Sequence, residues 1–424
     1  MLIIENQTVI GIRGDSRDIL NVVIPRGVLR IGDNAFRCKR LTSVTLPDSL
    51  TSIGHHAFEC CKGITSVTFP DSLTSIGHHA FDCCKGLTSV TLLDSLTILG
   101  YCAFYCCTEI TSVTLPDLLT SFGDHAFGFC RALTSLTLPD SLTHLGDAAF
   151  TSTGLVSVKL PDSLTRLGDN TFGSTGLVSV TLPDSLSHVD DYAFSHCKDL
   201  TFLTLPNSLT SIGESAFAFC KALTSFTLPE ALTRIGVRAF EQCIALTSVT
   251  LPDSLKAIPD YAFIACYALT SLTLPGSVTS VGDCAFHSCE SLTSLTLPDS
   301  LTDIGIAAFG ACGALTSVMF RPPVSRAAFI TWAIGNSRNR GNWQITTLKH
   351  SHNVLRLITT FALHRRDVSS MRSITKVFPG CRRLGETLGI PELRPYGFKD
   401  MYPDVVFFPL ETPPLRTHWG TSSM

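Results

Sequence analysis

The chain has 424 residues, of which 45% are hydrophobic and 16% charged, and its net charge is −3 at neutral pH. This composition excludes a disordered polymer, and no run of 18 apolar residues indicates a membrane-spanning helix. Residues 1–320 carry 17 Lys and Arg against 29 Asp and Glu, and residues 321–424 carry 15 against 6, giving net charges of −12 and +9. Two regions with different surfaces are expected.

The N-terminal segment is short and is expected to serve as a cap. Its first six residues lack the basic stretch and long apolar core of a secretion signal, which favours a cytoplasmic location. Residues 1–18 are predicted to cap the first repeat, because the terminal units of a repeat array need a polar outer face.

One phrase dominates residues 19–320. The segment LTSVTLPDSL at residues 41–50 returns in fourteen related copies, 22 or 23 residues apart, and an Ala-Phe pair such as Ala57-Phe58 recurs between copies. A fixed period of this length is the signature of a solenoid, so residues 19–320 are predicted to form about thirteen stacked coils.

Within one coil the residue pattern suggests a strand followed by turns. Leu41 and Val44 follow leucine-rich spacing around a strand with one buried face, and Pro47 ends the pairing because it has no N–H to donate. Residues 55–58 are predicted to form a short helical or 3₁₀ turn that places Phe58 in the core. The expected fold is therefore an α/β repeat, with strands on one face and helical turns on the other.

These residues resemble the leucine-rich repeat, and most closely its BspA-like variant. In that variant a strand-Pro-Asp turn is followed by Ile-Gly, a spacer, Ala-Phe and a Cys, as at residues 41–61. The resemblance implies a right-handed solenoid and makes a cell-surface location an alternative to the cytoplasm. The sequence departs from the general consensus by placing Ser49 and its equivalents where Asn or Cys is usual, so Ser or water must satisfy the turn backbone.

A cysteine lies three residues after most of the recurring Phe residues. One small thiol per coil is typical of a buried column, and zinc sites need ligands that converge from different directions. We therefore expect a buried structural column, called here the inner cysteine column, and no cofactor. Its members are Cys61, Cys84, Cys107, Cys130, Cys197, Cys220, Cys243, Cys266, Cys289 and Cys312.

Two histidine pairs lie one coil apart. His55-His56 and His78-His79 would stack about 5 Å apart, which suggests a weak candidate site for a transition metal. The two coils are almost identical in sequence, so a recent duplication also explains the pairing without a ligand.

The outward positions of the strands are mostly Ser and Thr, as at Ser43 and Thr45. Thr fits a strand surface by propensity alone, but a regular hydroxyl array could also match a glycan or a solid lattice. Four positions in the middle of the solenoid break the pattern. Exposed apolar and aromatic groups beside a charge are typical of a binding hot spot, so they are the candidate partner-binding residues, although neutral drift in a tolerant repeat also explains such changes. They are Val156, Lys159, Val178 and Phe202.

After residue 320 the repeat decays into a basic segment, residues 321–424, that is predicted to form a cap and tail. Helices are expected at residues 327–334, 344–366 and 371–377, followed by a proline-rich remainder. The segment contains no recognised nucleic-acid-binding module, so an acidic protein surface, including the solenoid itself, is the expected counterpart of its charge.

No catalytic motif is present: the sequence contains no P-loop, G-x-S-x-G, H-E-x-x-H or dinucleotide-binding fingerprint. The chain is therefore predicted to be a non-enzymatic scaffold that binds a protein partner on the strand face. The alternative is a surface-adhesive or structural protein whose Ser/Thr array binds glycan or a solid lattice.

Overall fold

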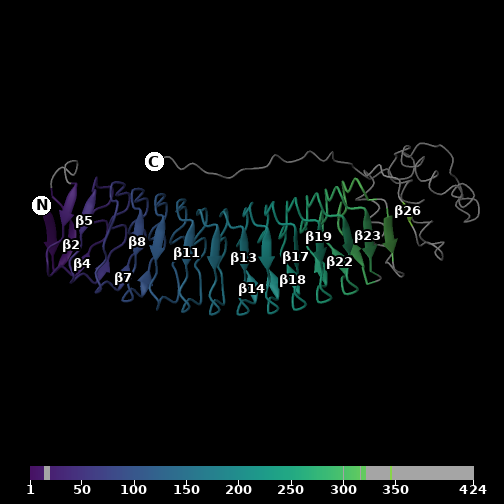
Figure 1. Ribbon diagram of the computed structural model, residues 1–424, viewed down its shortest axis with the longest axis horizontal. Helices are drawn as coiled ribbons and strands as arrows, with labels where there is room; N and C mark the ends of the chain where they lie inside the picture. Colours follow the sequence, from purple (N-terminus) through teal and green to yellow (C-terminus); the bar gives the residue numbers. More distant parts are fainter. Residues whose placement is uncertain (14–19, 299, 316, 321–343, 346–424) are drawn as a thin grey trace, which may run out of the picture. The chain divides into compact units, whose positions relative to one another are not determined.

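The computed structural model of the chain describes residues 1–13, 20–298, 300–315, 317–320 and 344–345 (Figure 1). It begins with an antiparallel hairpin of β1 (Leu2–Glu5) and β2 (Thr8–Ile12). Asn6 and Gln7 turn the hairpin with φ angles of 46° and 58°, the left-handed conformation that a tight hairpin turn requires. β2 pairs in parallel with β4 (Arg30–Ile31), so the hairpin covers one edge of a sheet in the solenoid.

Almost every coil contributes a first strand to one face of the solenoid, called here the strand face, and residues 66–68 are the exception. In the three-residue strands of this face the middle side chain is buried or half-buried and its two neighbours are exposed, as the alternation in the sequence predicts. These strands are β3 (Asn21–Val23), β5 (Ser43–Thr45), β8 (Ser89–Thr91), β10 (Ser112–Thr114), β11 (Ser135–Thr137), β12 (Ser157–Lys159), β13 (Ser179–Thr181), β15 (Phe202–Thr204), β17 (Ser225–Thr227), β19 (Ser248–Thr250), β21 (Ser271–Thr273), β23 (Ser294–Leu297) and β25 (Ser317–Phe320). Paired neighbours run parallel and in register, so equivalent residues of successive coils stack.

A second row of parallel strands, two residues each, follows the Pro-Asp-Ser turn of many coils. Its members are β4, β6 (Ser52–Ile53), β7 (Ser75–Ile76), β9 (Ile98–Leu99), β14 (His188–Val189), β16 (Ser211–Ile212), β18 (Arg234–Ile235), β20 (Ala257–Ile258), β22 (Ser280–Val281) and β24 (Asp303–Ile304). Isolated bridges from Ser121 to His144 and from His144 to Arg166 continue the row between β9 and β14. The sequence predicted only one strand per coil, so this second sheet is an addition to the expected fold.

The predicted helical turn is wrong for the described residues, which contain no helix. Each coil places two residues with positive φ four positions apart, for example His56 at 54° and Cys60 at 59°, on either side of the Ala-Phe pair. A left-handed residue interrupts a right-handed helix, so the segment instead bends as successive turns. Its amides bond across coils, as from Phe58 N to the carbonyl oxygen of Ala80 at 2.8 Å.

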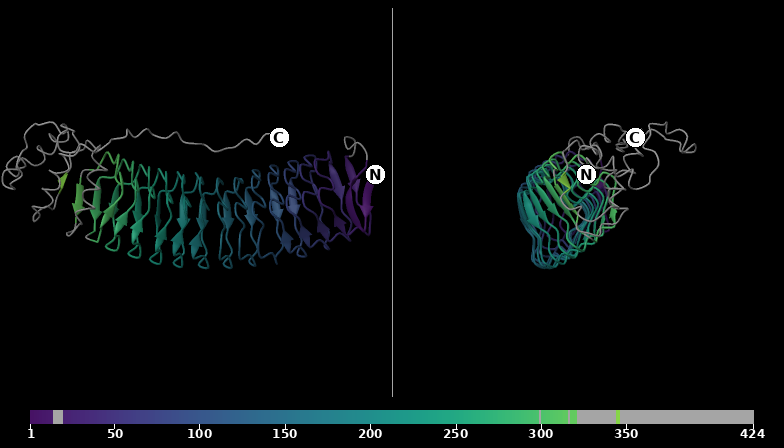
Figure 2. Two further views of the ribbon diagram at one scale, coloured as in Figure 1. Left: turned by 180° about the vertical axis from the view of Figure 1, so that it is seen from behind. Right: turned by 90° about the vertical axis from the view of Figure 1, so that its right-hand side faces the viewer.

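The core is a continuous column between the two rows of strands. Phe36, Phe58, Phe81 and their equivalents through Phe309 are fully buried and stack with nearly parallel rings whose centroids lie 5.0–6.0 Å apart. Viewed from one end, the coils lie one behind another (Figure 2). The leucine-rich repeat solenoid of about thirteen coils that the sequence predicts is therefore confirmed.

The serine of the Pro-Asp-Ser turn satisfies the backbone as expected. Ser141 Oγ donates to the carbonyl oxygen of Leu119 in the preceding coil at 2.6 Å, and Ser72 Oγ donates to that of Leu50 at the same distance. Equivalent bonds recur along the solenoid at 2.5–2.8 Å. A ladder of hydroxyls thus replaces the asparagine ladder of the general repeat.

The predicted C-terminal helices fall largely outside the described residues. Only the first two residues of the segment expected as helix at 344–366 are described, and they form β26 (Gln344–Ile345), which pairs in parallel with β25. The expected helix start at this point is therefore wrong.

Candidate functional site: the strand face

The structure brings three of the candidate binding residues into one strip across three consecutive coils. Val178 N donates to the carbonyl oxygen of Val156 at 3.0 Å, and Phe202 N donates to that of Val178 at 3.3 Å. Their side chains are 47%, 40% and 71% exposed for Val156, Val178 and Phe202, respectively. In a solenoid whose outer strand positions are mostly hydroxyls, this strip is an apolar ridge.

An open hollow of about 530 Å³ lies on the same face, across β10, β11 and β12. Its lining side chains are hydroxyls and short aliphatics together with one cation, Lys159, which ends β12 opposite Thr137 of β11. Lys159 and Val156 are three residues apart in the same coil, so the hollow and the apolar strip adjoin. Val156, Lys159, Val178 and Phe202, together with the hollow, are called here the mid-solenoid patch.

The hollow spans two of the strand pairs that make up this face. Among the described strands, β8 pairs with β10, and β11 pairs with β12, while β10 and β11 do not pair, which is also true of β12 and β13, of β15 and β17, and of β19 and β21. Val113 of β10 and Val158 of β12 are half-buried, whereas the middle residue of β8, β11 and β13 is buried. The opening therefore exposes part of the apolar interior beneath a rim of hydroxyl groups.

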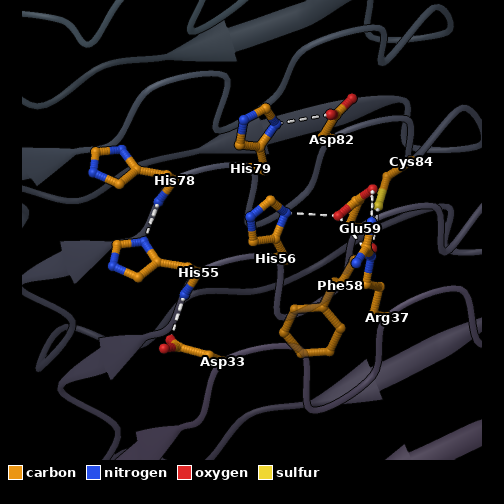
Figure 3. Close-up of polar contacts among 10 residues, drawn as sticks. All are labelled: Asp33, Arg37, His55, His56, Phe58, Glu59, His78, His79, Asp82 and Cys84. Atoms are coloured by element: carbon orange, nitrogen blue, oxygen red, sulfur yellow. Dashed lines mark hydrogen bonds and ion pairs between the residues drawn. The ribbon is translucent and has the colours of Figure 1, made fainter. Parts of the chain in front are cut away.

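The two histidine pairs form two stacked columns near the N-terminal end of the solenoid (Figure 3). The His55 and His78 rings lie 4.7 Å apart with an interplanar angle of 7°, and the amide of His78 donates to Nδ1 of His55 at 2.9 Å. The amide of His55 in turn donates to Asp33 Oδ1 at 2.8 Å. Asp147 accepts the equivalent hydrogen bond from the amide of the next coil. The His55 and His78 imidazoles therefore accept the amide hydrogen bonds that aspartates accept in other coils.

The outer histidine pair is held by carboxylates. His56 Nδ1 lies 2.6 Å from Glu59 Oε2, and His79 Nδ1 lies 2.9 Å from Asp82 Oδ2. The two Nε2 atoms belong to nearly parallel rings whose centroids lie 4.7 Å apart, so their lone pairs do not converge on one ion. No group of three or more His, Cys, Asp or Glu is arranged to hold a metal ion within the described part of the chain.

The inner cysteine column is buried in every coil that has it, as predicted. Each thiol points along the solenoid to the previous coil: Cys61 Sγ donates to the carbonyl oxygen of Phe36 at 3.0 Å. Burial raises the pKa of Cys61 to about 12, so the thiol stays protonated and can donate this bond. In two of the three coils that lack the cysteine, the Thr153 and Thr175 hydroxyls donate to the local Phe carbonyl instead.

A second column of cysteines, called here the outer cysteine column, was not predicted from the sequence. Its members are Cys38, Cys60, Cys83 and Cys106. The detectable signal was the Cys-Cys doublet at residues 60–61, 83–84 and 106–107. Because only the second cysteine of each doublet fits the common repeat column, the first required an explanation of its own.

Comparisons with known proteins agree on the fold. A family model described as the BspA type leucine rich repeat region, in six copies, matches residues 15–132, 144–270 and 213–331. No functionally curated protein matches the chain. Within the described residues, no helix is long and apolar enough to cross a membrane.

Two solved structures are similar over most of their lengths. A leucine-rich repeat protein from Bacteroides ovatus is 30% identical, with 75% of this chain and 92% of that chain covered and a TM-score of 0.63. A leucine rich cell surface protein from Faecalibacterium prausnitzii is 26% identical, with 79% and 95% covered and a TM-score of 0.51.

Proposed function

Because the chain belongs to the BspA-type leucine-rich repeat family, we propose that it is a non-enzymatic recognition scaffold that binds a protein partner at the mid-solenoid patch. The observation that carries this proposal is the coincidence of the exposed apolar strip with the hollow beside it. Apolar and aromatic side chains next to a single charge provide the desolvated centre that most protein interfaces need.

The chemistry of the patch defines the partner surface. The strip offers apolar area to a complementary apolar ridge or loop, and Phe202 is its largest exposed side chain. Lys159 stands at the border of the hollow, where an acidic group of the partner would pair with it. The expected partner therefore presents aliphatic or aromatic residues next to a carboxylate.

The repeat itself supplies variants that test the patch with little risk to the fold. Other coils carry Thr, Thr, Thr and Ser at the four equivalent positions, so Val156→Thr, Lys159→Thr, Val178→Thr and Phe202→Ser restore the common pattern. The four side chains, without the hollow, can also be placed three coils along, with substitutions Thr224→Val, Thr227→Lys, Thr247→Val and Ser271→Phe.

The test is affinity capture from lysate of the source cells with wild type, the restored variant and a variant that combines restoration with these four relocated side chains. The proposal predicts a protein that wild type recovers and the restored variant loses, and the combined variant should not regain it because the hollow stays at β10, β11 and β12. Equal recovery by wild type and the restored variant would show that binding occurs elsewhere on the chain.

A surface-adhesive role is the second candidate, favoured by the relative that is named a cell surface protein. That likeness supports an exposed location over the cytoplasmic one expected from the N-terminal sequence. The hydroxyl rim of the hollow, which includes Ser112, Ser135 and Thr137, would then contact glycan. Labelling intact source cells with a membrane-impermeant reagent separates the two locations, and binding of purified chain to immobilised glycans that the restored variant retains would favour adhesion.

A further inference from the structure

The turns at the two ends of the strand-face strands carry opposite charges. Because paired strands run parallel and in register, the turns that lead into them lie along one edge of this face and the turns that follow them lie along the other. Two residues before the first apolar residue of the repeat phrase, five coils carry a cation. These cations, called here the basic edge, are Lys62, Lys85, Arg131, Lys198 and Lys221.

The opposite edge is acidic, because an acid follows the proline that ends the strand segment in most coils. Its members, called here the acidic edge, are Asp48, Asp71, Asp94, Asp117, Asp140, Asp162, Asp184, Glu230 and Asp253. All members of both edges are exposed. Within the described part of the chain, no ion pair includes any of them. Both sets of charges therefore face solvent in a single copy.

Hydrogen bonds between coils hold both edges at the spacing of the repeat. On the basic edge, the amide of Ala222 donates to the carbonyl oxygen of Lys198, in the preceding coil, at 3.1 Å. On the acidic edge, the amide of Asp117 donates to Oδ1 of Asp94 at 3.1 Å. The same stack of coils sets both spacings, so the two columns of opposite charge have the same pitch.

The turns do not dictate the cations. Ile244, Tyr267 and Glu290 occupy the basic-edge position in three later coils, so this turn accepts apolar, aromatic and acidic side chains. Asp favours turns in its own right, yet Arg26 and Asn207 occupy the acidic-edge position in two other coils. The repeat thus tolerates a charge of either sign at both positions.

We propose that the two edges bind each other between copies of this chain, with the acidic edge of one copy against the basic edge of the next and the two solenoids parallel. Equal pitch then lets several ion pairs form at once: where equivalent coils meet, Lys62 faces Asp71 and Arg131 faces Asp140. The contact uses a different surface on each copy, so a free edge remains on both sides and further copies can add. The strand face, with the mid-solenoid patch, stays exposed in such an array.

The first test is sedimentation velocity of the full chain over a range of concentrations. Exposed ion pairs are individually weak and are screened by salt. At an ionic strength of about 0.01 M, where charges interact over about 30 Å, the proposal predicts species that grow beyond the dimer as concentration rises. At about 1 M, where that range falls to about 3 Å, it predicts a monomer. A monomer at every concentration at low ionic strength, or assembly that persists in high salt, would overturn it.

Charge reversal tests which surfaces meet, and the repeat itself supplies both replacements, as at Glu290 and Arg26. A first variant reverses the basic edge with Lys62→Glu, Lys85→Glu, Arg131→Glu, Lys198→Glu and Lys221→Glu. A second reverses five acids whose side chains accept no hydrogen bond among the described residues, with Asp71→Arg, Asp140→Arg, Asp162→Arg, Glu230→Arg and Asp253→Arg. Each variant alone has like charges on its two edges and should stay monomeric at low ionic strength, whereas their equimolar mixture should assemble. Assembly of either variant alone would contradict the proposal.

The matched control is Arg30→Glu with Arg234→Glu, because these exposed cations lie in β4 and β18, on the second row of strands. It should assemble as wild type does, and its failure to assemble would show that the edges are not responsible. Far-ultraviolet circular dichroism verifies that each variant keeps the fold.

Cross-linking locates the contact in the wild type. A carbodiimide joins lysine amines to carboxylates that they touch, and a mixture of isotope-labelled and unlabelled chains identifies links between copies. The proposal predicts links from Lys62, Lys85 or Lys221 to members of the acidic edge. Links that join the acidic edge only to lysines of residues 321–424, or that avoid both edges, would overturn it.

Discussion

The thiol of Cys84 donates a hydrogen bond to the carbonyl oxygen of Phe58 in the preceding coil, 3.1 Å away. The same bond recurs wherever the inner cysteine column is present, for example from Cys220 to Phe194 at 3.3 Å. The column therefore links coils through polar contacts inside an otherwise apolar core. Single substitutions can measure how much these contacts contribute to stability.

Replacing one inner thiol should weaken the solenoid. Cys220→Ala removes the bond to the Phe194 carbonyl and leaves a small cavity, so we expect a loss of about 1–2 kcal/mol in the free energy of unfolding, measured by urea denaturation. Cys284→Ala, at a half-buried position outside the column, should change it by less than about 0.5 kcal/mol. Equal effects of the two substitutions would contradict a role for the column.

The hydroxyl ladder of the turns can be repaired where it is broken. Leu118 stands at the turn position that Ser141 occupies in the next coil, and its side chain is 72% exposed. Leu118→Ser should restore the bond to the carbonyl oxygen of Leu96 and raise the free energy of unfolding by about 0.5–1.5 kcal/mol. Ser141→Ala should lower it by a similar amount because it removes the bond to Leu119. A destabilised Leu118→Ser variant would argue against the ladder.

Acid should loosen the N-terminal coils. Burial, together with neighbouring His55, His79 and His56, lowers the pKa of His78, whose Nδ1 accepts a hydrogen bond from Tyr101 N. The folded state therefore favours the neutral imidazole of His78. Its contribution to stability is complete above the ordinary histidine pKa of about 6.5 and is lost as the pH falls below that value.

His78→Asn keeps an acceptor for Tyr101 N but cannot be protonated. Thermal unfolding followed from pH 7.5 to pH 5 should therefore show a smaller loss of stability for the variant than for wild type. Parallel pH profiles would mean that His78 does not contribute to the acid sensitivity.

The repeat allowed the solenoid to be predicted because one pattern, repeated thirteen times, constrains every coil in the same way. The helical turn was wrong for a physical reason: His56 and its equivalents take left-handed φ angles that non-glycine residues rarely adopt, and tertiary stacking imposes them. The second sheet has only two residues per strand, too few for an alternation to be visible in the sequence.

The candidate site was also predictable from the sequence only in part. Pattern breaks identified Val156, Val178 and Phe202, because a residue that departs from a strict repeat is visible without a structure. The hollow beside them was not predictable, since β10 and β11 follow the common pattern and the half-burial of the middle residues of β10 and β12 depends on packing. The contribution of Lys159 to its lining likewise depends on the packing of three neighbouring coils.

The most direct measurement of the central claim is site-specific photo-crosslinking on the strand face. Ser179 is exposed on β13, next to Val178 and opposite Phe202, and Ser248 holds the equivalent position on β19. A photoreactive residue at position 179 should capture one partner protein, whereas the same residue at position 248 should not. Capture of that protein from both positions alike, or from position 248 alone, would contradict recognition at the mid-solenoid patch.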